Sequence, residues 1–262
     1  MARTPLFLQK GFTLIELVTV IIILSALGIA TSRYITTGVD LYTDITDRDK
    51  SLNSARFMME RLRREVSNAL PNSATIEKYN VTDNDGWCLT FTPIVASSIY
   101  AGDFPIFPLS KSSGSIATIS DYTVEAEDKA VVYLLEQSEL NASNTVQAIS
   151  GINTNNVWAI DGINASQDIL TFTGDASFLL ASPAKRLYII RNNISYYFNS
   201  NNELRRGSQC ADGVLMAENI SGSFSVKDAT LQRNGLVQAK FLLDPNGERM
   251  PVEQTVHINN VP

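Results

Sequence analysis

Residues 10–33 of the chain read KGFTLIELVTVIIILSALGIATSR, and this stretch decides how the chain begins to fold. From Phe12 to Ala30 there are nineteen residues, of which Glu16 is the only one with a charge. At about 1.5 Å per residue, a helix of this length measures roughly 28 Å, close to the thickness of the hydrocarbon layer of a membrane. The stretch therefore predicts a membrane-spanning helix that carries one acid.

Two basic residues, Arg3 and Lys10, come before the apolar run and indicate its orientation. Basic residues favour the cytoplasmic side of a membrane. We therefore expect a single-pass protein whose N-terminus lies in the cytoplasm and whose remaining chain lies across the membrane.

The apolar run has two alternative interpretations, a plain membrane anchor and a cleavable secretory signal peptide with Gly28-Ile29-Ala30 as its cleavage site. Neither alternative gives Glu16 a purpose, although a carboxylate at membrane depth costs roughly 2.5–3.5 kcal/mol. An acid that is kept at such a cost is functional by default, and we interpret Glu16 in this way.

The segment Lys10-Gly11-Phe12-Thr13-Leu14-Ile15-Glu16 resembles the signature of type IV prepilins and type II secretion pseudopilins. In that family a membrane-embedded aspartyl prepilin peptidase cuts after the glycine and methylates the new N-terminal amine. The resemblance implies that Gly11 is the last leader residue and that Phe12 becomes the N-methylated first residue. Glu16 then becomes the fifth residue of the mature chain.

The new amine of Phe12 supplies a cation that Glu16 can pair with. Four residues separate the two on a helix, so a pair within one chain is possible. The resemblance implies instead a pair with the Phe12 amine of a neighbouring subunit. A buried charge without a partner costs several kcal/mol, so such a pair would also select the register of assembly.

Helical character is expected to continue beyond the membrane to Leu70, where Pro71 ends it. We divide the chain into a leader (1–11), a transmembrane and assembly helix (12–32), an amphipathic helix half (33–70) and a β-rich periplasmic head (71–262). The apolar stripe of the amphipathic half is predicted to consist of Ile45, Leu52, Ala55, Met59, Leu62, Val66 and Ala69.

The opposite face of this helix half is charged. Arg61, Arg63 and Arg64 could be taken for a nucleic-acid patch, but Glu60 and Glu65 stand among them at ion-pairing spacings, Glu60 with Arg64 and Arg61 with Glu65. A solvated helix face is the simpler interpretation. The net charge of −6, which becomes −8 when the leader is removed, also argues against nucleic acid as a partner.

The head changes to short apolar runs separated by turn residues, which predicts an antiparallel sheet packed on the helix and an α+β fold like the pilin roll. The predicted strands are 87–92, 130–135, 169–172, 186–191, 194–198, 223–227, 237–243 and 252–258. Hairpin connections are expected at 199–202 and 244–247. Residues 96–120 are expected to form a long loop with Phe104, Ile106 and Phe107 tucked against the head, and a two-lobed sheet would break near 137–165.

The chain is poor in residues that perform catalysis. It holds one histidine, His257, which is expected to be an exposed strand residue, and two cysteines. Asp83-Asn84-Asp85-Gly86 resembles part of a calcium loop, but no glutamate stands at EF-hand spacing, so a polar turn is favoured. We predict that the protein is not an enzyme and has neither a cofactor nor a metal site.

The cysteines, Cys88 and Cys210, are both expected on the oxidising side of the membrane. A bridge between them would close a loop of about 120 residues and contribute roughly 2–4 kcal/mol. Two separate buried thiols are the alternative.

Further stretches resemble the minor pilins of the mannose-sensitive haemagglutinin (MSHA) pilus. They are 55–62, 69–73, 88–94, 100–107, 182–186 and 256–262. The resemblance implies a low-copy subunit of the bacterial inner membrane that passes into a pilus. Its implied partners are prepilin peptidase, other major and minor pilins, and an inner-membrane assembly platform with its ATPase. A large minor pseudopilin of a type II secretion system, and an anchored periplasmic enzyme or adhesin, are the alternative functions.

Overall fold

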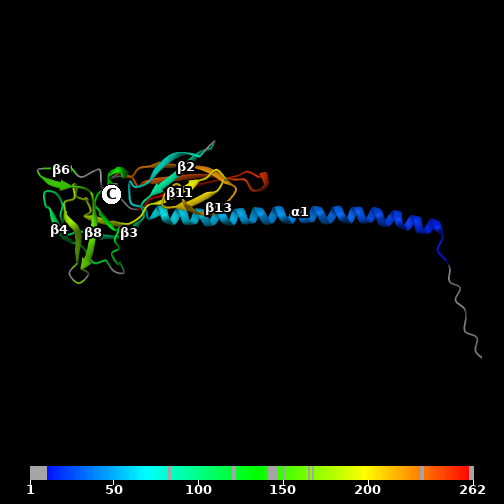
Figure 1. The fold of residues 1–262 in the computed structure, drawn as a ribbon, viewed down its shortest axis with the longest axis horizontal. Coiled ribbons are helices and arrows are strands. Elements are labelled where there is room, and N and C mark those ends of the chain that lie inside the picture. Colours follow the sequence, from blue (N-terminus) through cyan, green and yellow to red (C-terminus); the bar gives the residue numbers. More distant parts are fainter. Residues whose placement is uncertain are drawn as a thin grey trace, which may run out of the picture. The chain divides into compact units, whose positions relative to one another are not determined.

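A computed structural model of the chain describes residues 11–81, 84–119, 122–140, 147–149, 151–164, 166, 168–230 and 233–259. The fold is α+β and pilin-like, with one long helix and antiparallel sheets (Figure 1). The chain divides into two compact units, Met1–Lys50 and Ser51–Pro262.

The long helix α1 spans Leu14–Ser67, 54 residues. It ends three residues before the predicted Leu70, because the backbone there joins a strand. The Leu70 N–H donates to the Thr92 carbonyl at 2.8 Å, and Ala69 forms a bridge with Pro93. Pro71 also disfavours a helical conformation at the residue before it.

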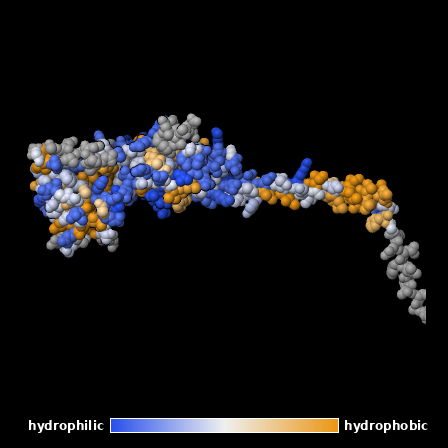
Figure 2. Space-filling view, in the orientation of Figure 1, coloured by the Kyte–Doolittle hydropathy of each residue, from blue (hydrophilic) through white to orange (hydrophobic). Residues whose placement is uncertain are grey.

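The first unit contains the apolar part of α1, which is long and apolar enough to cross a membrane. Its side chains are exposed on all sides, and Figure 2 shows the apolar surface that they form. Several hydroxyl groups in α1 donate to the helix carbonyl three or four residues earlier, which satisfies them without water. These are the hydroxyls of Thr19, Ser25, Thr31, Thr36, Thr43 and Thr46. A helix that is apolar all round is typical of a membrane span or a buried assembly core.

In the second unit, a five-stranded antiparallel sheet and a three-stranded antiparallel sheet share one core with α1. The five-stranded sheet has the order β1 (Thr75–Val81), β2 (Asn84–Phe91), β11 (Ile194–Phe198), β12 (Leu204–Gly207) and β13 (Gly213–Ala217). The three-stranded sheet consists of β14 (Ile220–Lys227), β15 (Leu236–Leu243) and β16 (Met250–His257).

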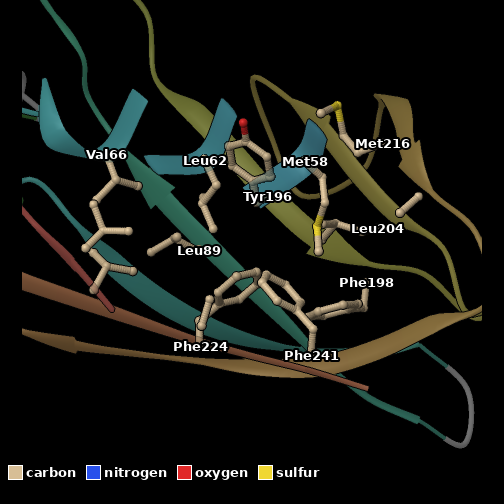
Figure 3. Close-up of a cluster of buried hydrophobic side chains, with 14 of the residues drawn as sticks. Met58, Leu62, Val66, Leu89, Tyr196, Phe198, Leu204, Met216, Phe224 and Phe241 are labelled. Carbon is tan, nitrogen blue, oxygen red and sulfur yellow. The ribbon is translucent and has the colours of Figure 1, made fainter. Parts of the chain in front are cut away.

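The shared core is built from side chains of all three elements (Figure 3). From α1 come Ala55, Met58, Leu62 and Val66. The predicted stripe is therefore correct for three of these, but it named Met59 where Met58 is buried, and Ile45 is exposed. The predicted steps of four, three and four residues and the observed steps of three, four and four have the same average, so helical periodicity does not distinguish Met58 from Met59.

A third sheet, called the closed sheet here, has the order β3 (Ile94–Ile99), β10 (Arg186–Ile190), β5 (Lys129–Val131), β8 (Val157–Asn164), β9 (Ile169–Ala176) and β4 (Lys111–Ser115). Its two end strands meet at the Tyr100–Ile116 bridge, where Ala101 N–H donates to Ser115 and Ala117 N–H donates to Ile99. Its interior holds a second core that includes Phe104, Phe172 and Phe178. A hairpin of β6 (Gln147–Ile149) and β7 (Ile152–Thr154) and two short 3-10 helices, Gln137–Leu140 and Pro245–Gly247, complete the described elements.

The closed sheet is inserted between two neighbouring strands of the five-stranded sheet. Phe91 at the end of β2 pairs directly with Ile194 at the start of β11. The chain therefore leaves the five-stranded sheet at Phe91, builds the closed sheet, and returns beside the point of departure.

The predicted strands all overlap observed strands, and the antiparallel sheet and both hairpin connections are confirmed. Two expectations are wrong. Residues 96–120 are not one long loop, because β3 and β4 lie there, although Phe104 is buried as expected. The head does not break near 137–165, because β8 lies in that stretch. The chain instead passes from one sheet to another between β2 and β3 and again between β10 and β11. β5 is shorter than predicted, since Tyr133 adopts a left-handed φ of 52° just after it.

Candidate functional site

The first candidate site is the start of α1. Gly11, Phe12 and Thr13 precede the helix, and the Phe12 side chain is 81% exposed. Thr13 caps the helix, since its hydroxyl accepts a hydrogen bond from the Glu16 N–H at 3.3 Å and its carbonyl accepts one from the same group at 3.1 Å. The Gly11–Phe12 peptide bond therefore lies outside the helix, where a protease can reach it without unwinding α1. Residues 1–10 of the leader are outside the described residues.

Glu16 occupies the first turn of α1, where a negative charge interacts favourably with the helix dipole. Its side chain is exposed and forms no ion pair with the described residues. The structure thus places one acid at the start of a helix that is otherwise apolar for about a membrane thickness. Such an arrangement can receive a cation from outside the chain.

A known sequence motif covers the same residues. Residues 7–32 match the prokaryotic N-terminal methylation motif. This motif is a type IV pilin-like signal, and it supports a protein of the general pilin or pseudopilin kind. No curated protein and no solved structure matches the chain. The match includes the glycine and phenylalanine of the expected cleavage position, Glu16 and the apolar run.

A second cluster, which sequence analysis missed, fastens the helix to the five-stranded sheet. The Glu65 carboxylate accepts two hydrogen bonds from the Arg206 Nε, at 2.9 and 3.0 Å, and one from the Tyr196 hydroxyl at 2.8 Å. Arg61 Nε adds a fourth at 3.1 Å. The expected Arg61–Glu65 pair is confirmed, but its acid is also bound by groups more than a hundred residues away. Periodicity along the helix carries no signal for such partners.

The environment of Glu65 perturbs its titration. Burial by itself raises the pKa of the Glu65 carboxyl, but the hydrogen bonds from its three partners outweigh burial and hold the pKa below its ordinary value. A carboxyl whose pKa is lowered by folding stabilises the folded state. The contribution is complete above about pH 4.3, the ordinary pKa of an unfolded glutamate, and is lost as the pH falls through the lower pKa of the folded state.

We expect Glu65→Gln to lower the free energy of unfolding by about 1–3 kcal/mol at neutral pH, because three charged or phenolic donors lose their anionic acceptor. The variant should also depend less on pH than the wild type between about pH 5 and about pH 3. Urea denaturation at several pH values measures both effects. Glu60→Gln is the matched control for stability at neutral pH, since Glu60 pairs with Arg63 and Arg64 on the solvated face and its loss should destabilise the protein much less than Glu65→Gln. Parallel pH curves for the wild type and Glu65→Gln would contradict the assignment.

The two cysteines form a disulfide, with the Cys88 and Cys210 Cα atoms 5.9 Å apart. Cys88 is a fully buried residue of β2, whereas Cys210 lies in the connection between β12 and β13. The bridge therefore ties this connection to β2, which is separated from β12 by β11 in the sheet. The Tyr197 hydroxyl adds a hydrogen bond to the Ala211 carbonyl at 2.8 Å.

Replacing both cysteines by serine is expected to lower the free energy of unfolding by about 2–4 kcal/mol, because a cross-link over 122 residues restricts the unfolded chain. Thiol titration of the denatured wild type should detect no thiol before reduction and two after it. Two thiols before reduction would show that the bridge is not formed in cells.

Among the described residues, no group of three potential metal ligands comes together. Asp83 of the suspected calcium fragment lies outside the described residues, and Gly86 belongs to β2. His257 is an exposed residue of β16, as expected. A polar hollow of about 500 Å³ opens beside β3, and Arg191 is one of its lining residues. That guanidinium is bound to the buried Asp128 at 2.6 Å, so the charges there serve the fold.

Proposed function

We propose that the protein is a minor pilin of an MSHA-like type IV pilus, specifically of the MshO type. In this proposal prepilin peptidase cuts between Gly11 and Phe12 and methylates the Phe12 amine. The mature subunit then leaves the inner membrane with the help of an assembly platform and its ATPase, and it joins other major and minor pilins in a filament that it initiates or caps.

The observation that carries the proposal is the position of Glu16. It stands five residues after the expected cleavage, in the first turn of a helix whose apolar surface is exposed on all sides. An acid in this position is stable in lipid only with a cation, and cleavage creates one at the neighbouring subunit's first residue. The exposed helix supplies a surface that assembly would cover. A role as an enzyme finds no such support in the described residues.

Intact-mass and N-terminal peptide analysis of the protein purified from cells tests the proposal. The expected mature chain begins at Phe12 with one additional methyl group, and in cells without prepilin peptidase it begins at Met1. A mature chain that begins at Thr31, as a signal peptide would leave it, or at Met1 despite active peptidase, would overturn the proposal.

The second candidate, a large minor pseudopilin, shares the same N-terminal signal and general architecture. Deletion of the gene distinguishes the two. Loss of surface pili with normal secretion of exoproteins supports the pilin, whereas retained pili with accumulated periplasmic exoproteins supports the pseudopilin.

A further inference from the structure

The end strand β13 of the five-stranded sheet has an apolar edge that the described part of the chain leaves uncovered. It reads Gly-Val-Leu-Met-Ala at 213–217 and pairs with β12 on one side. Val214 is 72% exposed and Leu215 is 39% exposed, whereas Met216 and Ala217 are buried in the core. Successive strand residues point to opposite faces, so the first half of β13 projects with both faces in solvent. An edge of this kind is a template for another strand.

The edges of three other strands of the head, β16, β1 and β3, are protected. β16 carries Pro251 and the exposed Glu253, and β1 carries the exposed Lys78. The edge of β3 is occupied at both ends, because the Ile94 N–H donates to a carbonyl at the end of α1 and the Ile99 carbonyl accepts from Ala117. β13 has neither a proline nor a charged residue. The irregularity in its pairing with β12 lies after Leu215, so residues 213–215 pair with β12 in a regular ladder.

The start of this edge is also tied to the rest of the sheet by one disulfide and two hydrogen bonds. The connection that leads into β13 is held by the Cys88–Cys210 disulfide and by the hydrogen bond from Tyr197 to Ala211. At the start of the strand, the Gly213 carbonyl accepts a hydrogen bond from Arg205 Nη1 at 3.0 Å. Preorganisation of this kind lowers the entropy lost when a segment binds.

The charges that flank β13 select the occupant. Asp212 precedes the strand and Glu218 follows it, and both are exposed. If a second copy paired antiparallel about Leu215, Asp212 of each strand would face Glu218 of the other. If a second copy paired parallel and in register, Asp212 would face Asp212 and Glu218 would face Glu218. Like charges directly opposite each other destabilise a strand pair, so a second copy is a poor partner.

We propose that β13 is a strand-addition site for an extended segment of a different protein, with an apolar centre and a basic residue at each end. The segment adds to the sheet through main-chain hydrogen bonds, and its basic ends meet Asp212 and Glu218. Under the proposed function this protein is a neighbouring subunit of the filament, and only this identification depends on that function.

Synthetic seven-residue peptides test the site on the full-length protein in detergent micelles. KTVTVTK carries the proposed pattern, ETVTVTE reverses its end charges, and KTVPVTK places proline where a ladder hydrogen bond would form. Fluorescence anisotropy measures their dissociation constants. We expect KTVTVTK to bind at least fivefold more tightly than either of the other two and to slow hydrogen exchange at residues 213–217.

The variant Val214→Lys should weaken binding of KTVTVTK at least tenfold, because it adds a cation to an edge that is proposed to accept cationic ends. Since Val214 is exposed, the variant should keep its thermal stability. Thr255→Lys also introduces a lysine, at an exposed position of the end strand β16, and this control should bind KTVTVTK like the wild type. Equal affinity for KTVTVTK and ETVTVTE, or protection outside β13, would overturn the proposal. So would self-association of the chain that Val214→Lys abolishes.

This experiment is independent of the N-terminal processing. Val214→Lys should still be cut after Gly11, so loss of peptide binding with normal cleavage concerns the edge alone. Cleavage at another position with intact peptide binding would instead reject the proposed function and leave the edge in place.

Discussion

Replacing Glu16 by valine is expected to lower incorporation into filaments by at least tenfold while leaving the helix in the membrane. The substitution removes the roughly 2.5–3.5 kcal/mol that a carboxylate costs at membrane depth, so insertion should not suffer. It leaves the N-terminal cation of the neighbouring subunit without its counter-ion, and an unpaired buried charge costs several kcal/mol during assembly.

Immunoblots of sheared pili and of the membrane fraction measure the two quantities separately. Leu17→Val, an apolar exchange one residue away, is the control and should be incorporated normally. Glu16→Asp keeps the charge on a shorter side chain and should retain part of the incorporation. A valine variant that enters pili at the wild-type level would show that Glu16 has no role in assembly.

The largest loss of stability is expected for Phe104→Ala, at about 3–5 kcal/mol. Phe104 is 1% exposed, and its ring lies at the centre of an aromatic group, 4.8 Å from Tyr100, 5.2 Å from Phe178 and 5.7 Å from Phe172. Removing the ring leaves a cavity inside the closed sheet, and its lining side chains lose their contacts with the ring.

Urea denaturation of the full-length protein, followed by aromatic near-ultraviolet circular dichroism, measures the loss. Phe57→Ala is the matched control, because Phe57 is 59% exposed on α1 and its ring contributes little to packing. A loss for Phe104→Ala no greater than for this control would mean that the closed sheet is not held together by its aromatic core.

The N-terminal half of the molecule could be predicted from the sequence because its physics is local. The length of the apolar run, the single acid and the helix-ending proline each act within a few residues, and the helix differs from its prediction only at its ends. The buried stripe was also predicted, apart from the exchange of Met59 for Met58 and the inclusion of the exposed Ile45, because helical periodicity identifies a face better than a single position.

The parts that could not be predicted depend on contacts between distant residues. β4 contains three serines and Gly114, a composition typical of a loop, yet it forms a strand because it closes a sheet. A Cβ atom at position 114 would lie 2.5 Å from the Phe104 ring, so the glycine is needed for packing. Glu65 is half of a helical ion pair by its spacing, but it also binds Arg206 of β12, which lies 141 residues further along the chain.

The insertion of the closed sheet has a consequence for how this protein can vary. Because Phe91 and Ile194 are cross-strand neighbours, everything between them replaces what would otherwise be a hairpin turn. An inserted module whose two ends lie side by side can be exchanged or enlarged, in evolution or by engineering. Such a change does not alter the register between β2 and β11. The module can therefore diversify while the framework of α1 and the two sheets around it remains under separate selection.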